Sequence, residues 1–274
     1  MGIVQHTDPQ ATEWHASLAA LAWQVDLGLV EVIGDLPLSA YDLPERAPWA
    51  TQAAPGTKPV VATPLVSADQ RTLVDAALDA ARHAAEAAAD LASLQAAIAA
   101  YPYCDLKKGA RSTVFADGNP GSRVLILGEA PGREEDQQGL PFVGAAGQML
   151  DRMFAAIGLS RTSPDPAAAI YITNVMPWRP PQNRDPEPGE IAMMLPFVTR
   201  HVALADPEVI VLMGNTPCAA ALGQRGITRL RGTWTTAFGK PALPMFHPAY
   251  LLRNPAAKRD AWADLLALQA RLRV

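Results

Sequence analysis

The chain has 274 residues, 49% of them apolar and 18% charged, so it can bury a substantial core and is not disordered throughout. The net charge is −4, but residues 1–100 are strongly acidic and residues 101–274 mildly basic, a difference that can accompany an anion-binding surface. The apolar runs are too short to cross a bilayer and no signal-peptide pattern is present, which argues against a membrane protein. The two cysteines lie far apart, which excludes a disulfide scaffold and predicts a cytoplasmic protein.

The first hundred residues predict helices joined by a proline-rich connection. Apolar side chains recur at helical spacing over residues 12–30, and the alanine-rich residues 68–100 predict one long helix or two in series. Between them, residues 35–64 hold many prolines and little periodicity, which is typical of an extended linker. We therefore expect a mainly helical N-terminal extension over residues 1–100 and a separate domain over residues 101–274.

From about residue 120 the pattern changes to alternating strands and helices. Buried strands are predicted by four short apolar runs, at residues 123–128, 170–175, 208–214 and 242–246. Helices are predicted between and after them, at residues 145–158, 188–204 and 257–272, with a short one from residue 215. This alternation predicts the α/β class, as a three-layer α/β/α sandwich with a central four-stranded parallel sheet.

Polar residues follow each predicted strand. The carboxyl ends of parallel strands meet at one edge of the sheet, where ligands bind in folds of this class. We therefore expect the residues at these ends to converge on one site. They are Gly128 and Glu129, then Asn174, then Gly214 and Asn215, and finally His247.

These positions also fit ordinary structural roles. Glu129 lies in the turn GEAPG, which fits a plain connection between strand and helix and lacks the lysine and serine or threonine of a phosphate-binding P-loop. Asn174 fits a turn cap, and His247 fits a packed side chain. Phe142, held between a proline and glycines in GLPFVG, is either a core residue or a platform on which a base stacks.

The segment after His247 combines apolar and basic residues. In HPAYLLRNP, Leu251 and Leu252 stand beside Arg253, between prolines. A rigid apolar tip with a basic rim suits insertion into a nucleic-acid groove, whereas a loop tucked into the core is the alternative.

Four motifs in this order resemble family 4 uracil-DNA glycosylases. They are VLILGEAPGREEDQQGLPFVGAAGQMLDRM, ITNVMPWRPPQNRDPEPGEI, RLRGTW and FHPAYLLRNPAAK. The resemblance covers most of residues 101–274 and implies an α/β/α sandwich that hydrolyses the N-glycosidic bond of deoxyuridine in DNA, as in base excision repair. The partners it implies are uracil-containing DNA and the products uracil and abasic DNA. We expect a monomer.

The resemblance implies a role for each candidate pocket residue. Glu129 would orient the attacking water, and Glu135 would support its loop. Phe142 would stack on the flipped uracil, Asn174 would read the edge of the base, and His247 would face uracil O2. The remaining residues implied to bind uracil are Gly128 and Ala130.

The same resemblance implies contacts with DNA. Leu251, Leu252 and Arg253 would enter the opened duplex, and Lys258 and Arg184 would contact phosphates. Insertion of apolar side chains between base steps is a known way to hold a kinked duplex open.

The sequence departs from the family at two places. The family binds an iron–sulfur cluster through four cysteines, whereas the corresponding positions here are Tyr101, Cys104, Trp178 and one near Met194. One thiolate cannot hold a cluster that needs four, so we expect no cofactor and no metal. The better-known uracil glycosylases carry an aspartate where this chain has Ala130, so we expect catalysis to depend on electrostatics and strain.

Two other functions fit part of the pattern. A lesion-binding or abasic-site-binding protein with weak turnover fits the missing cluster and Ala130. A nucleotide hydrolase unrelated to DNA is the third reading, and the paired leucines at 251–252 argue against it.

Overall fold

The computed structural model describes residues 68–273, and side chains from residue 73 onward. The chain divides into Met1–Pro64 and Leu65–Val274, and the described residues belong to the second unit. The helix predicted over residues 12–30 and the linker predicted over residues 35–64 lie outside the described part.

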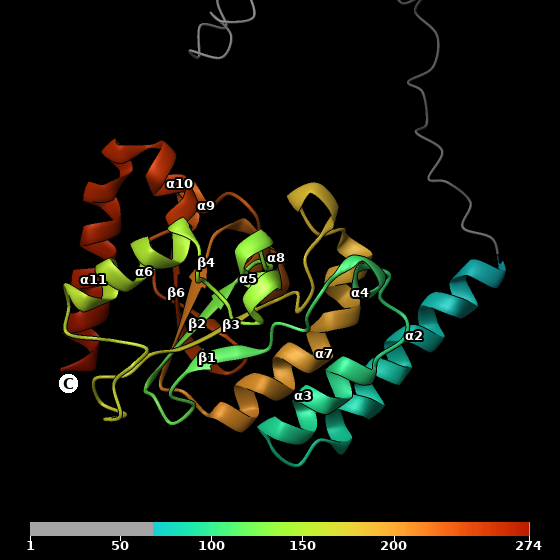
Figure 1. Cartoon of the computed structure of the whole chain (residues 1–274). Coiled ribbons are helices and arrows are strands. Elements are labelled where there is room, and N and C mark those ends of the chain that lie inside the picture. The colour runs from blue at the N-terminus through green and yellow to red at the C-terminus, as the bar shows by residue number, and fades with distance from the viewer. Residues whose placement is uncertain (1–67, 274) are drawn as a thin grey trace, which may run out of the picture. The chain divides into compact units, whose positions relative to one another are not determined.

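A mixed sheet of six strands forms the centre of the described unit, in the order β1-β3-β2-β4-β6-β5 (Figure 1). The strands are β1 (Ala116–Gly118), β2 (Val124–Gly128), β3 (Tyr171–Asn174), β4 (Val209–Met213), β5 (Thr235–Ala237) and β6 (Lys240–Met245). The middle four, β3, β2, β4 and β6, pair in parallel, and each edge strand pairs antiparallel.

The four predicted strands are therefore confirmed, but the predicted strand count of four is wrong. The two additional strands have three residues each, ADG and TTA, and contain no run of apolar residues. Strands this short at a sheet edge bury little apolar surface, so their hydrophobic pattern does not distinguish them from loops.

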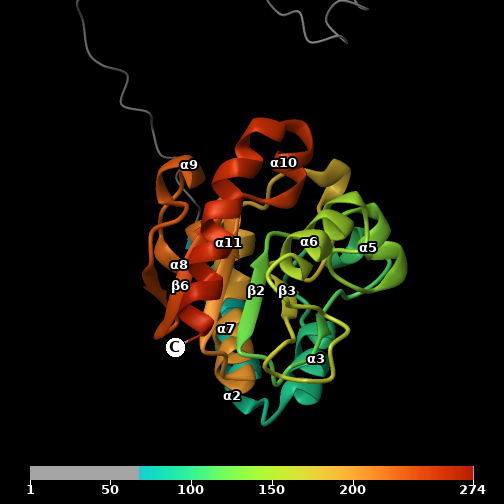
Figure 2. The same cartoon turned by 90° about the vertical axis from the view of Figure 1, so that its left-hand side faces the viewer.

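Helices cover both faces of the sheet, as the sandwich prediction requires (Figures 1 and 2). One face packs against α2 (Ala68–Ala87), α3 (Leu91–Ala100), α7 (Pro188–Ala205) and α8 (Asn215–Leu222). The other packs against α6 (Ala145–Ala155), α10 (Pro248–Arg253) and α11 (Lys258–Leu272). The short helices in the connections are α4 (Leu106–Gly109), α5 (Arg133–Gln138), η1 (Pro181–Asn183), α9 (Ile227–Leu230) and η2 (Pro255–Ala257).

Strand β2 shows how the sequence builds the two cores. Leu125 and Leu127 point into the core under α7, whereas Val124 and Ile126 point into the core under α6 and α11. Successive side chains of a strand alternate between faces, and here both faces are covered. This is why the strand reads as an unbroken apolar run instead of an alternating one.

The alanine-rich segment forms two helices, the second of the two forms predicted for residues 68–100. The break comes at Asp90, which caps α3 by accepting a hydrogen bond from the Ser93 backbone N–H at 2.7 Å. Arg200 of α7 donates to the carbonyl of Ala88 just before this cap, at 2.7 and 2.9 Å. The two helices thus pack on α7 and form part of the same core. None of the described helices is long and apolar enough to cross a membrane.

Candidate active site

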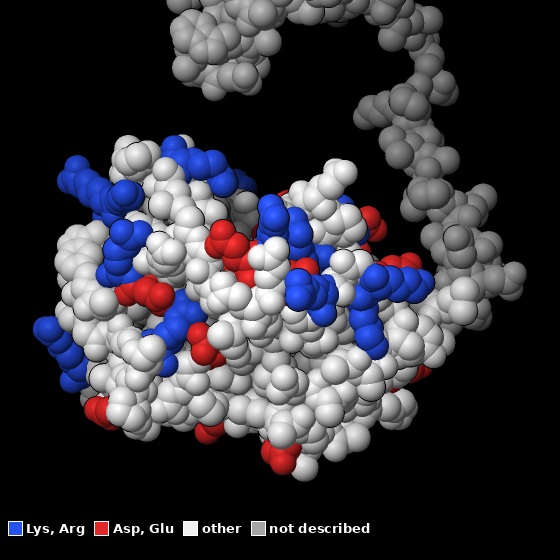
Figure 3. Space-filling view, viewed as in Figure 1, with Lys and Arg blue, Asp and Glu red and all other residues white. Residues whose placement is uncertain are grey.

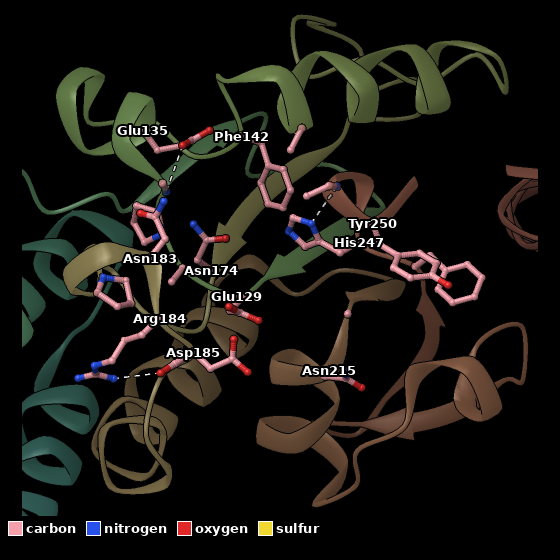
Figure 4. A pocket seen from close by; sticks show the side chains of 18 of the residues that line it. Glu129, Glu135, Phe142, Asn174, Asn183, Arg184, Asp185, Asn215, His247 and Tyr250 are labelled. Carbon is pink, nitrogen blue, oxygen red and sulfur yellow. Dashed lines mark hydrogen bonds between the residues drawn. The ribbon is translucent and has the colours of Figure 1, made fainter. Parts of the chain in front are cut away.

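A cavity of about 510 Å³ lies at the carboxyl ends of the parallel strands (Figure 4). Its walls come from the segments that follow β2, β3, β4 and β6, so residues far apart in the sequence meet there. The sequence-predicted residues that line it are Glu129, Ala130, Glu135, Phe142, Asn174, Arg184, Gly214, Asn215, His247 and Arg253.

Gly128, at the end of β2, has no room for a side chain between Asn174 and Phe142. A β-carbon at this position would collide with Asn174 Oδ1 and would stand 2.5 Å from Cε2 of Phe142. The asparagine and the phenylalanine can therefore approach the end of β2 only because residue 128 has no side chain.

The ring of Phe142 is fixed by its own backbone. Phe142 has a left-handed φ of 54°, and its carbonyl accepts a hydrogen bond from Arg161 at 2.9 Å. Any side chain at Gly147 would collide with the Phe142 backbone, so the glycine permits the close approach of α6. The ring stacks on His247 with centroids 5.4 Å apart and planes inclined by 29°. The two rings therefore form one wall of the cavity.

Asn174 is the last residue of β3 and is 7% exposed. Its Oδ1 is the one buried side-chain oxygen or nitrogen without a hydrogen-bond partner in the described residues. Figure 4 shows the side chain directed into the cavity. Buried polar atoms nearly always have a partner, so this oxygen is positioned to accept a hydrogen bond from a ligand.

His247 is neutral and carries its ring proton on Nε2. It caps α10, with Nδ1 accepting a hydrogen bond from the Ala249 backbone N–H at 3.1 Å. Burial, together with the charge of Arg253 and against the opposing effect of Glu135, lowers the pKa of His247 to about 4. Since Nδ1 is an acceptor, the proton of the neutral ring is on Nε2, which is available as a donor.

Glu129 follows β2 and holds a partly buried carboxylate. Its Oε2 accepts a hydrogen bond from the Thr216 hydroxyl at 2.6 Å. Burial raises the pKa of Glu129, the Thr216 hydrogen bond opposes this, Asp185 raises it and Arg225 lowers it. A carboxylate shielded from bulk water can act strongly on charge that develops beside it.

Glu135 is occupied by the backbone of two loops. Its Oε1 accepts from the N–H groups of Val143 and Gly144, both at 2.9 Å, and its Oε2 accepts from Gly132 at 3.1 Å. The side chain therefore ties the start of α5 to the loop that carries Phe142. The resemblance implies that Glu135 supports the loop of Glu129, to which Gly132 belongs. That role stays a prediction, and both carboxylate oxygens already have partners.

The paired leucines separate, which corrects the expectation that both would enter a duplex. Leu251 is fully buried in the core under α6 and α11, whereas Leu252 is 42% exposed. The segment is helical rather than an extended tip, and consecutive helical residues point about 100° apart. Only Leu252 of the two is exposed at the surface.

The predicted phosphate-binding residues differ in their surroundings. Arg253 and Lys258 are exposed at the ends of α10 and α11. Arg184 is half-buried and donates to both carboxylate oxygens of Glu190, at 2.6 and 2.9 Å, so its charge is largely compensated. Figure 3 shows Lys and Arg side chains scattered over this face of the molecule, with Asp and Glu side chains between them.

Sequence reasoning missed Thr216, although it had singled out the end of β4. It had named Asn215, whose Oδ1 accepts instead from the backbone N–H groups of Gly226 and Ile227 at 3.0 and 2.9 Å. The next residue faces Glu129 because the chain turns into α8 at this point. The position of Thr216, close after the end of a strand, indicated a site residue there. The sequence pattern does not show which of the two neighbouring polar side chains, Asn215 or Thr216, contacts Glu129.

The residues at the four cluster positions do not fit an iron–sulfur cluster. Tyr101, Cys104, Trp178 and Met194 are all buried in one hydrophobic core. Trp178 donates its indole N–H to Thr113 Oγ1 at 3.1 Å, and burial raises the pKa of the Cys104 thiol, which favours its protonated form. No group of three or more His, Cys, Asp or Glu side chains within residues 73–273 could hold a metal ion. The positions serve as apolar packing instead.

Fold and cavity together define an α/β protein whose cavity is walled by the stacked rings of Phe142 and His247 and by the amide of Asn174. The model of the uracil DNA glycosylase superfamily matches residues 115–266. The Type-4 uracil-DNA glycosylase of Thermotoga maritima is 38% identical over 156 residues, 55% of this chain and 77% of that protein. Those of Archaeoglobus fulgidus and Saccharolobus solfataricus are each 36% identical, over 59% and 57% of this chain and 82% and 74% of theirs. The chain belongs to the uracil DNA glycosylase superfamily.

Proposed function

We propose that this protein is a uracil-DNA glycosylase, which hydrolyses the N-glycosidic bond of deoxyuridine in DNA and leaves an abasic site. The observation that carries the proposal is the buried, unpartnered Oδ1 of Asn174, in a cavity walled by Phe142 and the neutral His247. The relatives named Type-4 uracil-DNA glycosylase support the same activity.

Asn174 accounts for the choice of uracil over cytosine. Uracil presents its N3–H donor beside the O4 acceptor, so Oδ1 accepts from N3–H while the amide NH₂ donates to O4. Cytosine presents an acceptor at N3 and a donor at N4, which reverses both partners. Each buried polar group left unpaired costs about 1–3 kcal/mol.

His247 stabilises the leaving base. When the bond between C1′ and N1 breaks, its electron pair stays with uracil, and negative charge develops on O2. The Nε2–H of the neutral ring donates to that oxygen, and one such preorganised donor contributes about 2.7–4 kcal/mol to the transition state. Phe142, whose ring stacks on His247, also stacks on the uracil and so holds the base in the plane where O2 meets this donor.

Glu129 acts on the sugar. The departing base leaves positive charge on the deoxyribose ring, which the carboxylate stabilises while it orients the water whose oxygen bonds to C1′. The proton that this water loses passes to the carboxylate and from there to bulk water. Ala130 provides no carboxylate of its own at the neighbouring position. Glu135 acts as a positioning residue, through the three backbone N–H groups that it holds.

The target base has to leave the helical stack to enter this cavity. Leu252, exposed on α10, fills the space that the base vacates, and Arg253 and Lys258 bind phosphates beside it. Leu251 packs beneath them and holds α10 to the core.

The experiment is a cleavage assay on labelled oligonucleotides that contain one uracil, one cytosine or one thymine, followed by alkaline cleavage of abasic sites. We expect strand breaks at uracil only, with repeated turnover. No cleavage at uracil in single or double strands would refute the proposal. A single, incomplete round of release with tight retention of the abasic product would favour the abasic-site-binding alternative.

A further inference from the structure

We propose that Thr216 is a positioning residue for this reaction: its hydroxyl binds one carboxylate oxygen of Glu129 and leaves the other to face the substrate. The inference rests on the proposed glycosylase function and assigns a role to a residue outside the motifs that carry the family resemblance.

The contact is short and partly buried. The Thr216 hydroxyl donates to Glu129 Oε2 at 2.6 Å, and Thr216 is 1% exposed. Hydrogen bonds from a hydroxyl to a charged oxygen are shorter and stronger than neutral ones, and 2.6 Å lies in their range. A hydroxyl so placed supports the ionised carboxylate.

Both partners stand on rigid parts of the fold. Thr216 is the second residue of α8, which packs against β2 and β4. The backbone of Glu129 is held to the end of β3, since its carbonyl accepts from the Met176 N–H at 2.9 Å. The hydrogen bond therefore fixes the carboxylate relative to the sheet.

The two carboxylate oxygens of Glu129 consequently have different roles. Oε2 is engaged by Thr216, whereas Oε1 has no hydrogen-bond partner among the described residues, and the side chain lines the cavity. Oε1 is thus the oxygen available to the water and the sugar. Without the hydroxyl, rotation of the carboxylate would exchange the two.

The other charged groups near Glu129 do not replace this hydrogen bond. Asp185, after β3, raises the pKa of Glu129, and Arg225, after α8, lowers it. These two face each other with Nη1 and Oδ2 4.0 Å apart, so their effects on the carboxylate offset. Glu135 on α5 is held by backbone N–H groups, and His247 at the start of α10 is neutral.

The consequence is a pH dependence of defined sign. Burial already favours the protonated form of Glu129, and Thr216 is the donor that opposes it. Removing the hydroxyl raises the pKa of Glu129 further, so the carboxylate is lost at a higher pH. Activity that needs the ionised form then declines earlier as the pH falls.

The test is the single-turnover rate of uracil release as a function of pH for the wild type, Thr216→Val and Thr216→Ser. We expect the acid limb of Thr216→Val to move up by about one pH unit, which makes the variant about tenfold slower on that limb. At high pH its rate stays within a few fold of wild type. Thr216→Ser keeps the hydroxyl and retains the wild-type limb. Thr216→Ala replaces the valine variant if that protein does not fold.

Two controls separate this role from a structural one. Thr199→Val removes a hydroxyl hydrogen bond of 2.9 Å on α7, outside the cavity, and should leave the profile unchanged. Titration of the Glu129 carboxyl by carbon-13 NMR, in the absence of DNA, should show the same upward pKa shift in Thr216→Val.

An unmoved acid limb and an unmoved Glu129 titration in Thr216→Val overturn the inference, even if the rate falls uniformly. An acid limb that persists in Glu129→Gln also overturns it, because the limb would then report another group. A wild-type protein that releases no uracil refutes the proposed function instead, while the NMR titration still tests the hydrogen bond itself.

Discussion

Substitution of His247 tests how the leaving uracil is stabilised. The imidazole has two functions in the structure: Nδ1 caps α10 through the Ala249 N–H, and Nε2–H faces the cavity. His247→Ala removes both. His247→Asn keeps a side chain that caps helices well but has no donor at the position of Nε2.

The two losses have different magnitudes. Loss of a helix cap costs about 1 kcal/mol of stability, which lowers the melting temperature slightly. Loss of one preorganised donor to a developing anion costs about 2.7–4 kcal/mol in the transition state, or about a hundredfold to a thousandfold in rate. Both variants should therefore be slow, although only His247→Ala should lose the cap.

The assay is single-turnover cleavage of a uracil-containing oligonucleotide above pH 5, where a histidine with a pKa of about 4 is neutral. His201→Gln is the matched control, because His201 is also buried with a pKa of about 4 but lies on α7, against Tyr171. It should lose stability and keep its rate.

A rate for His247→Ala within about fivefold of wild type would show that the imidazole donates nothing to the transition state. Glu129 would then have to carry the mechanism. The double variant that combines His247→Ala with Glu129→Gln should lose less activity than the product of the two single losses, because both residues act on one transition state.

Three further predictions follow from the same geometry. Leu252→Ala should lower cleavage of duplex DNA more than cleavage of single strands, with little change in melting temperature; equal losses on both substrates would contradict a role in filling the duplex. Leu251→Ala should instead cost about 2–5 kcal/mol of stability, measured by denaturant unfolding. Asn174→Asp should slow uracil release and raise the relative rate on cytosine, and an unchanged uracil-to-cytosine ratio would remove Asn174 from base recognition. The purified protein should be colourless, and stoichiometric iron by metal analysis would contradict the apolar packing around Trp178.

The amino-acid sequence predicts the central sheet, its parallel pairing and the edge of the sheet at which the cavity lies. The middle strands β2 and β4 are apolar runs buried along their whole length, and β3 and the last four residues of β6 are buried as well. Such buried strands leave a pattern that local sequence can carry. Because those strands are parallel, their polar ends meet at one edge of the sheet, and this alone predicts that Glu129, Asn174 and His247 lie close together. The edge strands left no such pattern, since three residues bury too little.

The burial and the partner of each side chain depend on how the helices pack on the sheet. That Leu251 is buried and Leu252 exposed depends on the rotation of α10 against α6, and the apolar sequence of the pair does not encode it. The hydrogen bond between Thr216 and Glu129 depends on the packing of α8 beside β2, because Glu129 lies 87 residues earlier in the chain. The neutral state of His247 likewise comes from burial by segments remote in sequence, and desolvation is a property of the packed fold and not of the residue.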